Sequence, residues 1–320
     1  GYSIERGYIN FSFNVTDDDL YMQNCSMWND FEGSWSSGST TGILGETGSV
    51  DIENFEWHWI SFNKQYDVPP IVIATPVTQN GAVGEDDSPL IPTINEVTTS
   101  GFNITICQDN GAVTCDPTVA LETLHYFVFD VNETNKYDWI DVGTVTTTTA
   151  GADTTLNFGK TFSNKPVVWT TPQTYNQAGN IAAHVWVEDD ATKTTSSTPI
   201  IGCVHQGIAN ACTAGQPDEE VGYVAIDIAN VNISGFQSGN ADISNSAWTA
   251  ATFDPLYINP RVMVTQNDDD GGEDPEYPWA KDVTTSGMDF RFCEADAADV
   301  CNTHTSEVVD WFALEQGYIT

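Results

Sequence analysis

The chain has 320 residues, of which 46 are Asp or Glu and nine are Lys or Arg, so its formal net charge is −37 at pH 7. So negative a chain is repelled by nucleic acids and by anionic membrane surfaces, and we expect neither as a partner. No apolar run approaches the roughly 18 residues of a membrane-spanning helix, so we expect no membrane insertion. Aromatic and β-branched residues are plentiful without sustained helical periodicity, which predicts an all-β chain.

Residues 1–45 are expected to form an N-terminal segment separate from the rest. Within it, residues 2–10 align with residues 312–320, so they resemble the last strand of a preceding repeat. Either the chain is a slice of a longer tandem protein, or this strand completes a sheet in another copy by strand addition. The rest of the segment is linker-like. Its cysteine, Cys25, is the unpaired one of seven and is either a free thiol or an interchain bond.

A composite motif then recurs and divides the chain into repeat 1 (46–135), repeat 2 (136–233) and repeat 3 (234–320). Each copy has a cysteine loop, a glutamate, an aromatic residue four positions later and an acid four positions after that. The three sets are Glu122–Tyr126–Asp130, Glu219–Tyr223–Asp227 and Glu307–Trp311–Glu315. Because three such coincidences are not expected by chance, we interpret the chain as a tandem array.

Each repeat is predicted to be a small antiparallel β-sandwich. An alternating strand leads to a proline and then to an apolar strand, as at Pro70, Pro166 and Pro260, where a missing ladder donor is tolerated. A polar, acidic loop and a turn into the cysteine strand follow. Short strands separated by turn signals at about 8–12 residues favour a sandwich.

The six remaining cysteines lie in pairs within the three cysteine loops: Cys107 and Cys115, Cys203 and Cys212, and Cys293 and Cys301. This spacing suits a local disulfide across a hairpin loop, and each would stabilise the fold by about 2.5 kcal/mol. A metal site is the alternative, but no histidine or second close cysteine recurs with the pairs. Disulfides predict an oxidising, extracellular or cell-surface location.

The order of these motifs resembles that of H-type lectins and of lectin-like repeats in bacterial surface and pilus-associated proteins. The shared elements are a glycine-led opening strand, an aromatic pair before a proline (Phe158, Phe162, Pro166), a Gly-Phe turn (Gly101-Phe102) and a closing aromatic-x-Ala-x-acid strand. The resemblance implies small antiparallel sandwiches, often associated as trimers, whose loops near the closing strands bind sugars.

The same resemblance implies where a sugar would bind. Members of the family use an arginine and an aromatic residue beside acidic or amide groups, and only repeat 3 has this combination, as Arg291, Asp310 and Trp311. Trp279, beside Pro278 near an acidic cluster, is expected to be an exposed contact. Most other tryptophans, among them Trp57, Trp59 and Trp169, alternate with apolar neighbours and are expected in the core.

Calcium is the only cofactor that the sequence suggests. Hard oxygens crowd a glycine-containing loop, and the alternative is a solvated acidic loop; the residues are Asp268, Asp269, Asp270, Glu273 and Asp274. The recurring glutamates could be acid catalysts, but their presence in every repeat favours a structural role as acceptors of backbone N–H groups near the cysteine loop. No Gly-x-Ser-x-Gly motif is present and no histidine position recurs, so we expect no enzyme.

Two functions are therefore expected from the sequence. The first is a secreted, non-enzymatic adhesin or extracellular fibre component that binds surface glycans. The second is a purely structural filament subunit that assembles with neighbouring copies by strand addition of its N-terminal segment. Both imply a homo-oligomer or a part of a longer tandem chain.

Overall fold

The computed structural model describes residues 43–78, 80, 90–108, 115, 119–147, 150–177, 182–187, 192–204, 217–233, 235–244, 247–254, 256–267, 276–294 and 306–320. The predicted N-terminal strand (2–10), Cys25 and the acidic loop of repeat 3 lie outside these residues. Residues 42–320 form one compact unit. The described part contains no helix long and apolar enough to cross a membrane.

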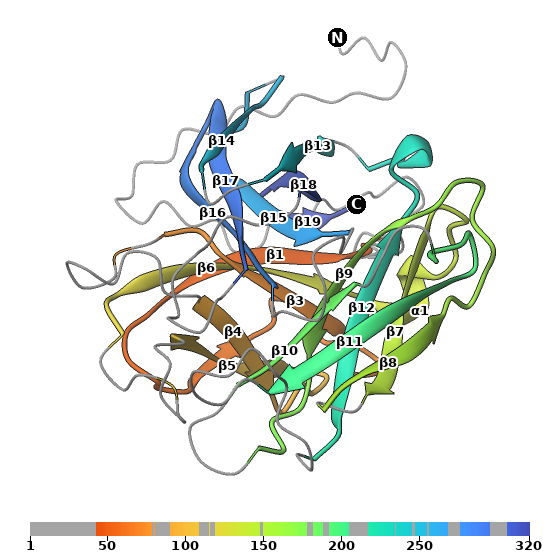
Figure 1. Ribbon diagram of the computed structural model, residues 1–320, viewed down its shortest axis with the longest axis horizontal. Coiled ribbons are helices and arrows are strands. Elements are labelled where there is room, and N and C mark those ends of the chain that lie inside the picture. The colour runs from red at the N-terminus through yellow and green to blue at the C-terminus, as the bar shows by residue number, and fades with distance from the viewer. Residues whose placement is uncertain are drawn as a thin grey trace, which may run out of the picture. The chain divides into compact units, whose positions relative to one another are not determined.

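The fold is all-β, as predicted, and is built from small antiparallel sheets (Figure 1). Repeat 1 contributes six strands: β1(Gly45–Ile52), β2(His58–Ser61), β3(Ile71–Pro76), β4(Leu90–Asn95), β5(Gly101–Gln108) and β6(Glu122–Phe129). They form the sheets β1-β6-β3 and β2-β5-β4. The short helix α1(Val131–Thr134), capped by the carboxylate of Asp130, leads into repeat 2.

Repeats 2 and 3 have the same connectivity. The strands of repeat 2 are β7(Ile140–Thr147), β8(Ala150–Asn157), β9(Val167–Pro172), β10(Ala183–Val187), β11(Ser197–Val204) and β12(Glu219–Ile226). After the 3₁₀ turn η1(Ile228–Asn230), those of repeat 3 are β13(Gln237–Ile243), β14(Thr249–Thr252), β15(Pro260–Gln266), β16(Glu276–Thr284), β17(Gly287–Glu294) and β18(Glu307–Glu315). In each repeat the sixth strand lies between the first and third, and the fifth between the second and fourth.

The two sheets of each repeat pack on their own apolar cluster. That of repeat 1 includes Val72, Phe102 and Val128, and equivalent clusters fill repeats 2 and 3. The sixth strands serve a second core as well, because successive side chains of a strand point to opposite faces. In β18, Val309, Trp311 and Ala313 face the core of repeat 3, whereas Phe312 and Leu314 face the opposite way.

The residues on that opposite face join a central cluster shared by all three repeats. Phe312 of repeat 3 is fully buried there and meets Phe127 of repeat 1 and Trp169 of repeat 2, each with ring centroids 4.8 Å apart. Burying one such side chain stabilises a fold by about 1.5–3 kcal/mol. The repeats are therefore held together by a core of their own rather than by linkers.

Side chains from neighbouring repeats also accept backbone N–H groups at the outer edges of β3, β9 and β15. The N–H of Val72 in repeat 1 donates to Oε1 of Gln173 in repeat 2 at 3.0 Å. The N–H of Val168 in repeat 2 donates to Oδ1 of Asn267 in repeat 3 at 3.0 Å. The N–H of Val262 in repeat 3 donates to Nδ1 of His125 in repeat 1 at 3.1 Å. The pattern is cyclic, so each repeat satisfies an edge donor of another.

A last strand, β19(Gly317–Ile319), closes this cycle by pairing with β1 of repeat 1. The N–H of Leu44 donates to the carbonyl of Ile319 at 2.7 Å, and the N–H of Gly317 donates to Oγ1 of Thr47 at 3.0 Å. Ile319 is buried in the central cluster. Repeat 3 thus completes the sheet of repeat 1.

The disulfide Cys107–Cys115 is confirmed, with Cα atoms 5.1 Å apart. Cys203 is also disulfide-bonded. The predicted partners Cys212 and Cys301, and the side chain of Cys293, lie outside the described residues, so those two pairings stay predictions.

Candidate functional site: the cleft between repeats 2 and 3

The four residues predicted to bind a sugar belong to two different sheets. Arg291 on β17 and Trp279 on β16 are cross-strand neighbours, while Asp310 and Trp311 lie on β18. The guanidinium of Arg291 lies 4.6 Å from the ring centroid of Trp279 and 4.5 Å from that of Trp248. The structure therefore joins Arg291 and Trp279 in a buried cation–π stack.

The expectation that Trp279 is an exposed contact in a polar loop is wrong. Trp279 lies inside β16 and is completely buried. Pro278 suggested a loop, but β16 is an edge strand of the sheet β14-β17-β16, where a proline is tolerated. Trp311 is also buried, against Phe253 and over Gly239, so neither ring is available to a sugar in this structure.

Asp310 instead lines a cleft of about 330 Å³ between repeats 2 and 3, which we call cleft 2/3. Seven of its twelve lining residues are amides, carboxylates or lysines, and the other five are apolar. Repeat 2 supplies Asn164, Lys165, Lys193 and Asp227, and repeat 3 supplies Asn240, Asn267 and Asp310. Such a wall can both donate and accept hydrogen bonds over a short distance.

Asn267 is the buried centre of this wall, with 2 % of its surface exposed. Its Oδ1 accepts the N–H of Val168 at 3.0 Å and lies 3.3 Å from Nζ of Lys193. Because a backbone N–H requires an acceptor, these contacts fix which amide atom is the oxygen. Nδ2, the other atom, has no hydrogen-bond partner among the described residues. A buried donor of this kind is uncommon and invites an explanation.

The floor of the cleft is held by the closing acid of repeat 2. Asp227 is buried, and its carboxylate accepts two hydrogen bonds from Asn164. The backbone N–H donates at 3.1 Å and the side-chain Nδ2 donates at 3.0 Å. Asp130 and Glu315 act similarly at the equivalent loops, since Asp130 pairs with Lys64 at 2.8 Å and Glu315 accepts the N–H of Ile258 at 3.0 Å. The recurring acid thus anchors the loop between the second and third strands.

The recurring glutamates are structural, as the repetition indicated. Glu122 and Glu219 are fully buried, and each accepts a backbone N–H, from Asn80 at 2.6 Å and from Asn176 at 2.9 Å. Burial raises the pKa of both carboxyls. The donors come from the loop after the third strand, rather than from the cysteine loop that the sequence suggested. Glu307 is equally buried.

The two equivalent joints between repeats differ from cleft 2/3. Between repeats 1 and 2 a cleft of about 530 Å³ has Gln173 at the position of Asn267. Its Nε2 is already used, donating to the carbonyls of Val72 at 2.7 Å and of Thr171 at 2.9 Å. Between repeats 3 and 1, the guanidinium of Arg261 contacts Ser49 at 3.1 Å and Gln316 at 2.6 Å. Nε of Arg261 is also a buried donor without a partner among the described residues. Cleft 2/3 differs in that its unpaired donor, Nδ2 of Asn267, belongs to a residue that lines a cleft.

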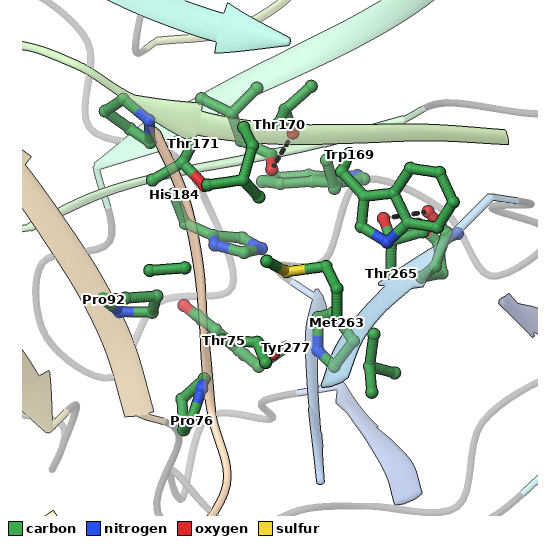
Figure 2. Close-up of a pocket in the computed structure, with 18 of the residues that line it drawn as sticks. Thr75, Pro76, Pro92, Trp169, Thr170, Thr171, His184, Met263, Thr265 and Tyr277 are labelled. Atoms are coloured by element: carbon green, nitrogen blue, oxygen red, sulfur yellow. Dashed lines mark hydrogen bonds between the residues drawn. The ribbon is translucent and has the colours of Figure 1, made fainter. Parts of the chain in front are cut away.

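A smaller cavity of about 50 Å³ lies where the repeats meet. Figure 2 shows its lining, which includes Trp169, Met263 and one threonine from each repeat. These threonines, Thr75 of β3, Thr171 of β9 and Thr265 of β15, have equivalent pairing positions in their sheets. The volume suits one or a few water molecules rather than an organic ligand. We interpret this cavity as a gap left where the three repeats pack together.

The calcium expectation stays a prediction, because residues 268–275 lie outside the described residues. Within the part that the structure describes, no group of three or more His, Cys, Asp or Glu side chains could hold a metal ion. Sequence reasoning named Asp310 as a sugar contact but did not place Asn267, Lys193 or Asn164 beside it, because only folding brings these residues of two repeats together. Comparison with protein-family models, with curated proteins and with solved structures finds no match.

Proposed function

We propose that the chain is an extracellular, non-enzymatic protein of three lectin-like sandwiches that binds an uncharged sugar unit in cleft 2/3. The observation that carries the proposal is Nδ2 of Asn267, a buried donor without a partner among the described residues, in a cleft of about 330 Å³. Nδ2 itself is buried, so a bound hydroxyl would satisfy it once the cleft wall opened slightly. Leaving such a group unpaired costs about 1–3 kcal/mol, which ligand binding would recover.

The chemistry of the wall favours a sugar over other small ligands. A hydroxyl both donates and accepts, so it can pair with the carboxylate of Asp310, the amide of Asn240 and the amide of Asn267. The net charge of −37 disfavours polyanionic glycans at long range. The resemblance to H-type lectins supports the same ligand class.

The direct test is a glycan array with the intact protein, with and without calcium, followed by titration calorimetry on the hits. Asn240→Ala removes an exposed amide of the wall and should weaken binding about tenfold, the effect of roughly 1.4 kcal/mol. Thr144→Ala is the matched control, because Thr144 holds the equivalent position on β7 and lines the cleft between repeats 1 and 2. A blank array with a verified fold, or equal losses in both variants, would count against the proposal.

A structural role is the second candidate. The outer edge of β1 is occupied by β19 of the same chain, so a strand from another copy would have to replace β19 there. Residues 2–10 resemble the segment that contains β19, so the same kind of pairing would join one copy to the next. Deleting residues 1–10 should then abolish self-assembly measured by light scattering. Unchanged assembly after the deletion would exclude this role. Hydrolysis products in a screen of polysaccharides would contradict both proposals.

A further inference from the structure

Two exposed indoles and one half-buried tyrosine ring lie at the boundary of repeats 1 and 2, and we call them the aromatic strip: Trp57, Trp59 and Tyr175. Trp57 is 37 % exposed and Trp59 is 48 % exposed, although tryptophan is usually buried. Trp57 immediately precedes β2, and exposure alternates from Trp57 to Ser61, so the two indoles point to the same side of this segment. Neither residue lines cleft 2/3.

The rings are held in place rather than free to rotate. Trp57 meets Tyr175 edge-on with centroids 5.3 Å apart, and Phe55 supports it at 6.0 Å. The indole of Trp59 covers Gly101, where a Cβ would come within 2.6 Å of the ring, and its Nε1 donates to Oγ of Ser61 at 3.1 Å. A ring fixed before binding loses little conformational entropy on binding.

The surroundings of the strip are polar. Glu56 is exposed beside Trp57. Asn103 lies opposite Trp59 on β5, and its Nδ2 donates to Glu96 at 2.6 Å. A lipid surface or the apolar face of a partner helix would bury these carboxylates without compensation. A ligand with an apolar C–H face and a rim of hydroxyls would cover the rings and leave the carboxylates solvated or hydrogen-bonded.

We propose that the aromatic strip binds the chain of a neutral polysaccharide by stacking sugar rings on Trp57 and Trp59. The Cα atoms of Trp57 and Trp59 are about 7 Å apart in extended backbone, and the ring of Tyr175 supports Trp57 edge-on at 5.3 Å. Two indoles at this separation offer stacking positions for two sugar units, which suits a chain rather than a monosaccharide. The net charge of −37 and the adjacent carboxylates select against anionic polymers. This site does not depend on cleft 2/3 and would remain if that cleft bound nothing.

The experiment measures affinity for cellulose, chitin, mannan and galactan, with heparin as the anionic probe. Trp57→Ala and Trp59→Ala should each weaken binding to the preferred neutral polymer about tenfold or more, as expected for a central aromatic contact. Trp57→Phe and Trp59→Phe keep a ring and should retain most of the affinity. Tyr137→Ala is the matched control, since Tyr137 is an equally exposed aromatic (38 %) away from the strip.

The outcomes separate this site from cleft 2/3 and from other occupants. Loss in the alanine variants with retention in Asn240→Ala assigns binding to the strip. Unchanged binding in both alanine variants, no binding to any neutral polymer, or stronger binding to heparin overturns the proposal. A concentration-dependent dimer that Trp59→Ala abolishes also overturns it, because the strip would then be a contact between copies. Thermal unfolding and the phenylalanine variants show that any loss is not a folding defect.

Discussion

At the three joints between repeats, one side chain in each accepts a valine N–H: Gln173, Asn267 and His125. The acceptors are equivalent in role but differ in chemistry. The glutamine uses its whole amide, the asparagine leaves a donor unused, and the histidine accepts through a ring nitrogen. Single residues therefore make the three joints chemically different.

His125 gives its joint a pH dependence. Burial, and secondarily the charge of Arg261, lower its pKa well below the usual 6.5. As the pH falls through about 6.5, His125 becomes protonated in the unfolded chain but stays neutral in the folded chain. The contribution of His125 to stability is therefore present above that pH and is lost as the pH falls.

His125→Gln keeps an acceptor for the N–H of Val262 but cannot titrate. Between about pH 7.5 and 5.5 the free energy of unfolding should fall less in this variant than in the wild type. The difference between the two proteins should grow by up to about 1.4 kcal/mol per pH unit. Urea unfolding at both pH values measures this. The buried carboxyls Glu46, Glu122 and Glu219, whose pKa values are raised, are common to both proteins and cancel in the comparison. Parallel pH profiles would contradict the prediction.

Gly239 shows how closely a backbone approaches a core ring. A Cβ at this position would come within 2.8 Å of the Trp311 indole, which is buried and cannot move aside. Gly239→Ala should therefore lower the free energy of unfolding by about 1–3 kcal/mol, the cost of overpacking. Ser238→Ala, the neighbour on the same strand, is the control, and equal stability of the two variants in guanidinium unfolding would refute the clash.

The sequence predicted residues whose role is local to one repeat. The spacing of Glu122, Tyr126 and Asp130 correctly marked the closing strand. These residues lie on one continuous segment, in which side chains alternate between the two faces, so their spacing in the sequence reflects their positions in the structure. The exposure of Trp57 and Trp59 was missed, since alternation reveals two faces but not which one meets the core. Cleft 2/3 was also missed, because its residues lie on segments far apart in the chain.

At the scale of elements, the strand pairs and the loops that join them carry the repeat. The disulfide Cys107–Cys115 links β5 to the segment that leads to β6. Its two cysteines are eight positions apart in the sequence. Replacing both cysteines by serine should lower the free energy of unfolding by about 2.5 kcal/mol by the loop-entropy model. Denaturant unfolding of the oxidised wild type and the oxidised double variant measures the loss, because the other disulfides are then the same in both proteins. Equal stability of the two would show that the Cys107–Cys115 link contributes nothing.

For the whole molecule, the central cluster predicts one cooperative unit. Phe312 contacts the other two repeats, so Phe312→Ala removes contacts from all three. The substitution should lower the free energy of unfolding by about 3–5 kcal/mol and shift a single transition. Scanning calorimetry tests both claims, with the exposed Leu121→Ala as control. Several transitions, of which only one moves, would mean that the repeats unfold separately.

The cyclic capping of Val72, Val168 and Val262 has one more consequence. In an assembly of three identical subunits, any substitution at a joint would appear at all three, and a change that created a ligand site would weaken every contact at once. Here the three repeats belong to one chain and differ in sequence, so a substitution at one joint leaves the other two unchanged. Gln173 and His125 can preserve the contacts of two joints while Asn267 changes at the third, so stability and specificity can evolve separately within one chain.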